Sequence, residues 1–211
     1  MRRMVRILGC LGVSVAAALP LAAQTPRQTA VLAGGCFWGI QNLFEHVTGV
    51  TRVVSGYAGG SAETANYEHV GTETTGHAES VEITFDPSVV SYETLLDVFF
   101  SVGHDPTQLN RQGPDEGSSY RSAIFYRNDE QRAVAQAVIA RLTASHAYAK
   151  AIVTQVVPFT GFYRAEEYHQ DFAVHHPDYP YIVVNDLPKV AHLREKFPQL
   201  YRESPVLTTS R

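Results

Sequence analysis

The residue in this chain best suited to chemistry is Cys36, which lies in the segment GGCFWG at positions 34–39. It is the only cysteine after Cys10, and the neighbouring Trp38 is the only tryptophan of the protein. A cysteine can be an inert buried residue, or a nucleophile when its thiol ionises. The aromatic pair Phe37 and Trp38 could give such a nucleophile an apolar wall.

Two expected elements position this thiol. The apolar run at 30–33 predicts a short buried strand. Apolar residues then follow at helical spacing, namely Ile40, Leu43, Phe44 and Val47. Cys36 would therefore sit where a strand turns through two glycines into the first turn of a helix. Unpaired backbone N–H groups and the helix dipole favour an anion there, so we expect the pKa of Cys36 to be lowered.

The sequence Gly-Cys-Phe-Trp-Gly at 35–39 resembles the active-site signature of the peptide methionine sulfoxide reductase A family. Further similarity covers most of the chain between about residues 29 and 181, including Gly-Tyr-Ala-Gly-Gly at 56–60. The resemblance implies an oxidoreductase of protein repair under oxidative stress. Its substrates would be oxidised proteins or free methionine S-sulfoxide, and its preference for the S epimer comes from the resemblance alone.

Further site residues follow from the same resemblance. A strand predicted at 80–85 begins just after Glu79, to which the family pattern gives the role of acid, and Tyr67 would bind the oxygen. The long loop at 104–122 resembles a second family signature, in which Asp115 and Tyr120 face the sulfoxide. Without the resemblance, Glu79 would be a solvated strand-end carboxylate and Asp115 an ordinary turn residue.

Reduction of a sulfoxide requires a nucleophile, a proton for the oxygen and a grip on the methyl group. A thiol with a pKa of about 8.5 is about 3% ionised at pH 7, so lowering its pKa gains at most about thirtyfold. A positioned general acid contributes about 10² to 10⁴. We therefore expect Glu79 to be the decisive partner, kept protonated by burial against Phe37 and Trp38, which would enclose the methyl group. Tyr67 and Tyr120 would donate hydrogen bonds to the oxygen. Asp115 would orient the polar end of the site or the peptide.

The expected product on the enzyme is a sulfenic acid at Cys36. Many relatives then form a disulfide with a resolving cysteine near the C-terminus, but no cysteine follows Cys36 here. Regeneration would require an external thiol, either a small one or a thioredoxin-like protein. The alternatives are a cysteine hydrolase using Cys36 with His77 or His104, a thiol peroxidase, and a binding module with an aromatic pocket.

The N-terminal segment resembles a secretory signal peptide at 1–23. Arg2, Arg3 and Arg6 precede an apolar stretch at 7–21 that is short for a membrane span, although an uncleaved anchor is the alternative. A single domain at 24–211 would remain, without Cys10, and would be periplasmic. The net charge of −4 offers no basic field for nucleic acid. We expect a monomer that is free of the membrane after cleavage.

The order of expected elements predicts an α+β fold. Strands at 51–55, 80–85, 123–126 and 152–157 alternate with helices at 92–102, 130–144, 165–174 and 189–197. This pattern indicates a two-layer α/β sandwich with a mixed sheet, a ferredoxin-like core and long coil segments. We expect no cofactor and no metal. A carboxylate–histidine cluster of Glu167, Asp171, His175 and His176 is discounted because charged residues on a helix face are normally solvated.

Overall fold

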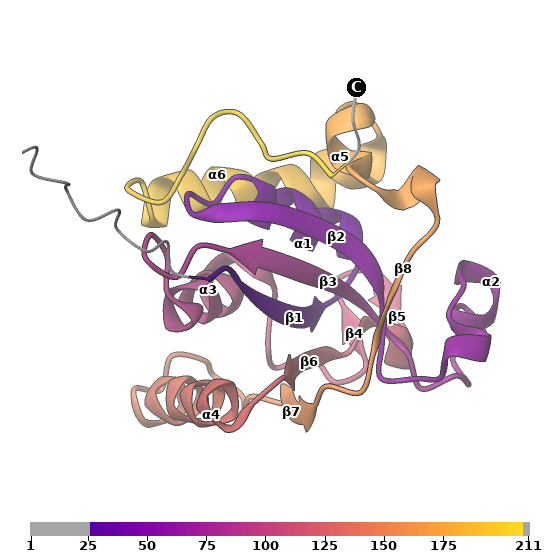
Figure 1. Cartoon of the computed structure of the whole chain (residues 1–211), viewed down its shortest axis with the longest axis horizontal. Coiled ribbons are helices and arrows are strands. Elements are labelled where there is room, and N and C mark those ends of the chain that lie inside the picture. The colour runs from indigo at the N-terminus through magenta and orange to yellow at the C-terminus, as the bar shows by residue number, and fades with distance from the viewer. Residues whose placement is uncertain (1–25, 209–211) are drawn as a thin grey trace, which may run out of the picture.

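The computed structural model describes residues 26–208 of the 211-residue chain. Figure 1 shows a sheet with helices packed around it. The predicted signal segment at 1–23 lies outside the described residues. In the described part of the chain, no helix has the length and apolar character needed to cross a membrane.

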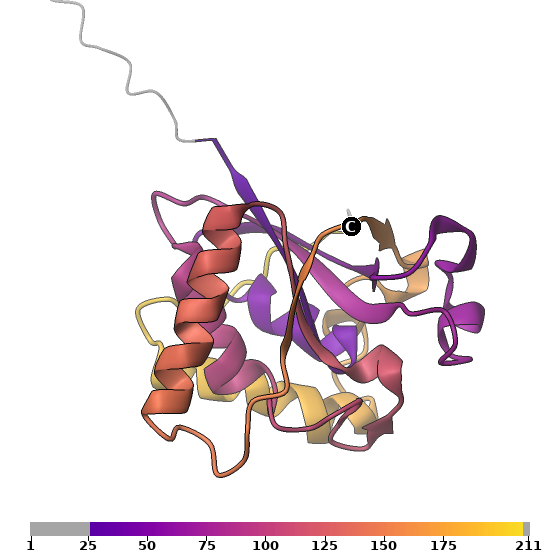
Figure 2. The same ribbon diagram turned by 90° about the horizontal axis from the view of Figure 1, so that it is seen from below.

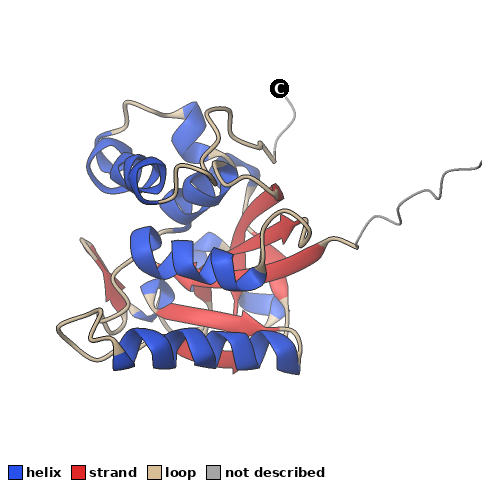
Figure 3. Ribbon diagram, turned by 90° about the vertical axis from the view of Figure 1, so that its left-hand side faces the viewer, coloured by secondary structure: helices blue, strands red, loops and turns tan. Residues whose placement is uncertain are grey.

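Six strands form one mixed sheet in the order β7-β6-β1-β3-β2-β8. Figure 3 shows strands in red and helices in blue. They are β1 (Gln28–Gly34), β2 (Val50–Ala58), β3 (Ala78–Phe85), β6 (Ser122–Tyr126), β7 (Gln155–Pro158) and β8 (Phe162–Arg164). Neighbouring strands are antiparallel except for the parallel pair β6 and β7. A separate hairpin pairs β4 (Arg111–Gln112) with β5 (Asp115–Glu116). The predicted α+β class with a mixed sheet is confirmed, and the ferredoxin-like core stays a prediction.

The sheet is curled. Its two edge strands, β7 and β8, are separated in the chain only by residues 159–161. Such a link spans about 14 Å at most, whereas the edges of a flat six-stranded sheet lie about 24 Å apart. The edges must therefore approach each other where this segment crosses (Figure 2). The crossing segment adds Val157, Phe159 and Phe162 to a small apolar cluster with Val31 and Ala33 of β1.

The helices supply the larger core on the other face of the sheet. They are α1 (Phe37–Glu45), α2 (Tyr67–Val70), α3 (Tyr92–Val98), α4 (Asp129–Ala144), α5 (Phe172–His175) and α6 (Leu187–Lys196). Ala30 and Leu32, which alternate with the residues of the small cluster along β1, pack in one core with side chains of α1, α3, α4 and α6. The side chain of Ser91 caps α3, accepting from the Thr94 N–H at 3.0 Å.

Two predicted helices differ from the structure. The helix expected at 92–102 is α-helical only to Val98 and continues as a π-helical turn, Phe99–Gly103. The single helix expected at 165–174 is wrong. A 3₁₀ turn, Glu167–His169, is followed by Asp171 in the left-handed region at φ 52°, and then by α5. The chain breaks there because Asp171 is held in a buried polar network.

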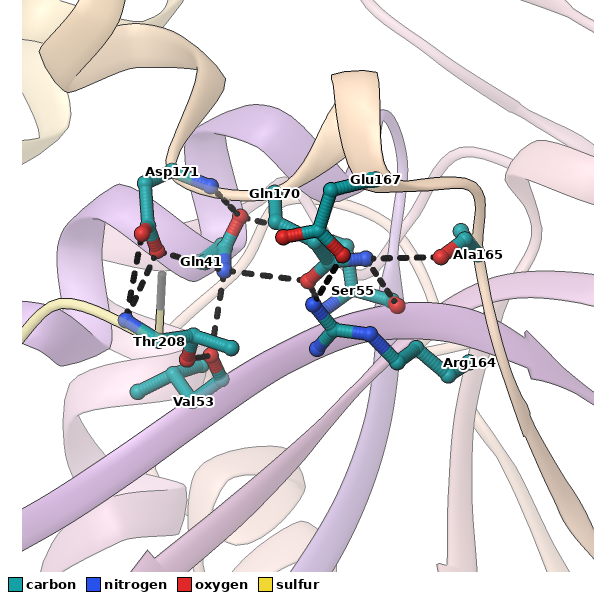
Figure 4. Close-up of polar contacts among 9 residues, drawn as sticks. All are labelled: Gln41, Val53, Ser55, Arg164, Ala165, Glu167, Gln170, Asp171 and Thr208. Atoms are coloured by element: carbon teal, nitrogen blue, oxygen red, sulfur yellow. Dashed lines mark hydrogen bonds and ion pairs between the residues drawn. The ribbon is translucent and has the colours of Figure 1, made fainter. Parts of the chain in front are cut away.

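This network fixes α1 against β2 (Figure 4). The Gln41 side chain on α1 donates to the Val53 carbonyl at 3.0 Å and accepts from the Ser55 hydroxyl at 2.9 Å and the Asp171 N–H at 2.9 Å. Gln170 bonds both backbone groups of Ser55 at 3.0 Å. Satisfied polar groups in a core impose one geometry, because any other arrangement leaves a buried group unpaired. The helix that begins after Cys36 is therefore held in one position on the sheet.

A second buried carboxyl, Glu45, lies at the last residue of α1. It is fully buried, and burial together with the neighbouring Asp171 raises the pKa of Glu45 well above its ordinary value. Asp171 in turn accepts from the Thr208 N–H at 3.1 Å, which ties the C-terminal segment to this region. Glu45 is therefore protonated in the folded protein, whereas it ionises near pH 4.3 when the chain is unfolded.

Replacing Glu45 with glutamine should make stability less dependent on pH. In the parent protein the folded state keeps a proton that the unfolded state loses, so unfolding free energy falls as pH rises above about 4.3, by up to about 1.4 kcal/mol per unit. Glu45→Gln removes this loss. Urea unfolding at pH 4, 5, 6 and 7 measures how the unfolding free energy depends on pH. The control is Glu203→Gln, because Glu203 is exposed. Equal pH slopes in parent and Glu45→Gln would contradict the expectation.

Candidate active site

The thiol of Cys36 stands directly before α1, as the sequence predicted. Gly35 makes the turn at φ +94°, where a Cβ would also come within 2.6 Å of the Gln112 side chain. The prediction of a lowered pKa was wrong. Burial raises the pKa of Cys36 well above its ordinary value, and the carboxyl groups of Glu79 and Asp186 add to this, against a lowering hydrogen bond from the Trp38 backbone. The loss of solvation raises the pKa of Cys36 more than the helix N-terminus lowers it, so the thiol is neutral at rest.

One cavity of about 160 Å³ contains all seven site residues predicted from the sequence, together with two tyrosines that were not predicted. Its lining is Cys36, Phe37, Trp38, Tyr67, Glu79, Asp115, Tyr120, Tyr179 and Tyr181. These residues come from the N-cap and start of α1, the start of α2, β3, the β4–β5 hairpin, the 3₁₀ turn Ser118–Tyr120 and the segment before α6. The long loop that looked structureless in the sequence thus carries a hairpin that places Asp115 in the cavity.

Glu79 is the second residue of β3 and is 4% exposed. Its Oε2 accepts a hydrogen bond from the Phe37 N–H at 3.0 Å. Burial raises the pKa of Glu79 to about 8, although that hydrogen bond lowers it, and Asp115 adds a further increase. The carboxyl is therefore mainly protonated at neutral pH. A protonated carboxyl beside a nucleophile can deliver a proton to a leaving oxygen.

Asp115 is paired with a tyrosine that the sequence interpretation missed. The Tyr181 hydroxyl donates to Oδ2 of Asp115. Burial raises the pKa of Asp115, against this lowering hydrogen bond. Tyr179 and Tyr181 line the cavity. An alternating pattern of side chains could not have revealed them, because residues 177–178 form a turn and Tyr181 already has helical backbone angles.

A histidine and a glutamate outside the predicted set of site residues support the aromatic wall. The Trp38 indole N–H donates to Nδ1 of His169 at 3.1 Å. His169 is 2% exposed, and burial lowers its pKa to about 4, so the ring is neutral and carries its proton on Nε2. Glu166 accepts from the Tyr67 N–H at 2.9 Å and the Tyr57 hydroxyl at 2.8 Å. Phe172 stacks on Trp38 with ring centroids 3.8 Å apart.

The histidines proposed for a hydrolase are engaged elsewhere. His104 contacts the Phe99 carbonyl at 3.1 Å and the Ser122 hydroxyl at 2.6 Å, and burial lowers its pKa to about 4. His77 contacts the Ser61 carbonyl at 2.9 Å. A cysteine hydrolase needs a histidine that can take the thiol proton, and neither ring is oriented for this. Between residues 26 and 208, no group of three or more His, Cys, Asp or Glu side chains is arranged to hold a metal ion.

Comparison with known proteins decides the family. Residues 28–201 match the family model of peptide methionine sulfoxide reductase. The chain belongs to this family. It is 58% identical over 183 residues to peptide methionine sulfoxide reductase MsrA 2 of Mesorhizobium japonicum, covering 87% of this chain and 94% of that protein. It is 48% identical to MsrA of Thermus thermophilus, covering 84% of this chain and 99% of that protein.

The fold agrees with this assignment. Methionine sulfoxide reductase A of Corynebacterium diphtheriae superposes with a TM-score of 0.67 at 33% identity, covering 74% of this chain and 78% of that chain. The reduced form of Mxr1 from Saccharomyces cerevisiae gives a TM-score of 0.66 at 30% identity, covering 72% and 87%. This reductase is therefore a peptide-methionine (S)-S-oxide reductase, and the roles of its individual site residues stay predictions.

The His169–Trp38 hydrogen bond can be tested with the only tryptophan as its own probe. His169→Leu leaves the buried indole N–H without its acceptor, and we expect kcat/KM for a sulfoxide peptide to fall about tenfold, with a shifted Trp38 emission. His169→Asn keeps an acceptor close to the Nδ1 position and should restore both. If His169→Leu matches the parent in kcat/KM and in emission, the hydrogen bond does not position Trp38.

Proposed function

We propose that Cys36 attacks the sulfoxide sulfur of an oxidised methionine while Glu79 protonates the oxygen. The observation that supports this is the presence of a neutral thiol and a neutral carboxyl in one small cavity. As Glu79 gives its proton to the oxygen, the thiol proton can replace it. The oxygen then passes from the methionine sulfur to the Cys36 sulfur, and the bond between the two sulfur atoms breaks as the thioether leaves. The sum of this half-reaction is Cys–SH plus sulfoxide giving Cys–SOH plus thioether, so no proton is drawn from solvent. A site with two buried, protonated groups is suited to that stoichiometry.

The remaining cavity residues fit the other requirements. Tyr67 and Tyr120 stay protonated because burial raises the pKa of both, so their hydroxyls can donate to the oxygen as charge develops on it. Phe37 and Trp38 supply an aromatic wall for the S-methyl group, where sulfur and methyl contacts with rings are favourable. Asp115, with its Tyr181 partner, orients the polar end of the substrate.

The product on the enzyme would be a sulfenic acid on Cys36, reduced by an external thiol. The support is the sequence, in which no cysteine follows Cys36 within the 211 residues. A small thiol or a thioredoxin-like protein could serve as reductant. The substrates would be oxidised proteins or free methionine S-sulfoxide, in a protein-repair role.

The N-terminal sequence supports a location for this repair. The basic and apolar character of 1–23 favours export across the inner membrane and a periplasmic enzyme, acting as a monomer at 24–211 without membrane attachment. An exported repair enzyme would meet methionine residues oxidised outside the cytoplasm.

Substitution of Glu79 tests the proton donor. Glu79→Gln keeps a side-chain acceptor for the Phe37 N–H but has no acidic proton, so the single-turnover rate should fall at least about a hundredfold. In the parent, that rate should decline as pH rises through about 8, where the carboxyl ionises. The matched control is Glu82→Gln on the same strand, where Glu82 pairs with Arg127 at 3.0 Å. A loss of less than about tenfold in Glu79→Gln would reject the role.

Stoichiometry without reductant tests the intermediate. We expect the Cys10→Ser variant, mixed with excess sulfoxide, to release one methionine per enzyme and to gain one oxygen atom, mapped to Cys36 by mass spectrometry. Cys10→Ser removes the one other thiol that could form an intramolecular disulfide. Release of methionine without a mass change on Cys36 would contradict the sulfenic acid.

A further inference from the structure

Cys36 borders a second cavity besides the one already described. This second cavity has a volume of about 290 Å³ and shares Cys36, Asp115 and Tyr181 with the substrate cavity. Its lining contains none of Phe37, Trp38 and Glu79. The Asp115–Tyr181 hydrogen bond therefore lies in the wall between two spaces that both reach the thiol. The second cavity lacks the aromatic pair that would enclose a thioether, so we expect a different occupant there.

The chemistry of Cys36 requires a second direction of approach. When a thiol attacks the sulfur of a sulfenic acid, the new S–S bond forms on the side away from the S–O bond that breaks. The oxygen comes from the substrate cavity, where Glu79 and the tyrosines surround it. An attacking thiol is therefore best placed in a space that touches Cys36 but lies outside that cavity, and the second cavity meets this requirement.

The second cavity also carries two basic side chains. Lys189 and His192 stand three residues apart on α6, which puts them on the same face of the helix. Lys189 Nζ donates to the Asn185 carbonyl at 2.7 Å and to Asp186 at 2.8 Å, and an ammonium group has three donors, so one remains for a ligand. The acidic side chain in the lining, Asp115, is engaged by the Tyr181 hydroxyl. This pattern suits a small thiol that carries carboxylate groups.

We propose that the second cavity binds a low-molecular-weight thiol with carboxylate groups and directs its sulfur to Cys36. This rests on the proposed sulfenic acid. The thiol sulfur bonds to Cys36 as the S–O bond breaks, and the oxygen leaves as water after taking up the thiol's proton. A second thiol then displaces Cys36 from the mixed disulfide, which releases the oxidised disulfide and restores the Cys36 thiol.

The two half-reactions separate this proposal from the one on which it rests. Methionine released per enzyme in one turnover, without reductant, measures the first half-reaction. The rate at which isolated oxidised enzyme recovers its free thiol measures the second. If the parent enzyme yields no sulfenic acid, the proposed function fails at the first step. If it does, the variants below decide about the second cavity alone.

Changing the charge at position 192 tests whether the second cavity binds an anionic thiol. Glutathione is anionic and mercaptoethanol is neutral. His192→Glu should slow recovery with glutathione about fivefold, and His192→Lys should leave it equal or faster, whereas recovery with mercaptoethanol should be the same in both. Ala191→Glu adds the same charge one residue away, outside the cavity lining, and is the matched control.

A steric block tests the route for any thiol. Ser101 is exposed and lines the cavity, so Ser101→Trp should slow recovery with both small thiols at least about tenfold relative to Ala191→Trp. Equal recovery in Ser101→Trp and Ala191→Trp would overturn the proposal. So would an effect of the His192 variants on the first half-reaction alone, which would assign the cavity to the peptide substrate. Recovery faster with thioredoxin than with glutathione, and insensitive to the charge at 192, would assign the reductant to a protein dithiol and also overturn it.

Discussion

The loss of solvation around Cys36 and Glu79 is the constraint on which the rest of the site depends. Burial raises the pKa of the thiol and of the carboxyl, so both are mainly neutral at rest. Each group is a poor reagent by itself in this form, because a thiol is a weak nucleophile and a buried acid is reluctant to ionise. Together they contain the protons that oxygen transfer rearranges, and water need not enter.

The walls of the cavity are held in place by several buried polar groups. The Gln41 network fixes α1 on β2, and therefore fixes the direction in which Cys36 leaves the sheet. His169 and Glu166 hold Trp38 and Tyr67 through one short segment, so the methyl wall and an oxygen donor share a support. The cost of burying these groups is offset because each forms hydrogen bonds in the fold.

The curl of the sheet brings distant parts of the chain together around this site. The three-residue link between the edge strands closes one side, while β8 lies next to the end of β2. The segment after β8 then contributes Glu166, His169 and Phe172 behind the aromatic wall. It continues to Tyr179 and Tyr181 in the cavity and to Lys189 and His192 beside it. One C-terminal stretch thus serves both spaces that reach Cys36.

Local signals in the sequence determined the parts of the protein whose cause is local. The strand, the two glycines and the helix around Cys36 follow from apolar periodicity and turn chemistry over a few residues, as does the Ser91 cap. The resemblance supplied Glu79, Tyr67, Tyr120 and Asp115, and all four line the cavity that Cys36 also lines.

Tertiary structure alone decided the quantities that depend on residues far apart in the sequence. The pKa of Cys36 moved opposite to the expectation, because burial by many segments outweighs one helix end. The helix expected at 165–174 was lost, because Asp171 bonds a glutamine 130 positions away. The partnership of Trp38 with His169 and the second cavity likewise required the folded chain. Periodicity reports which face of an element is apolar, but desolvation and hydrogen-bond pairing are properties of the assembled interior.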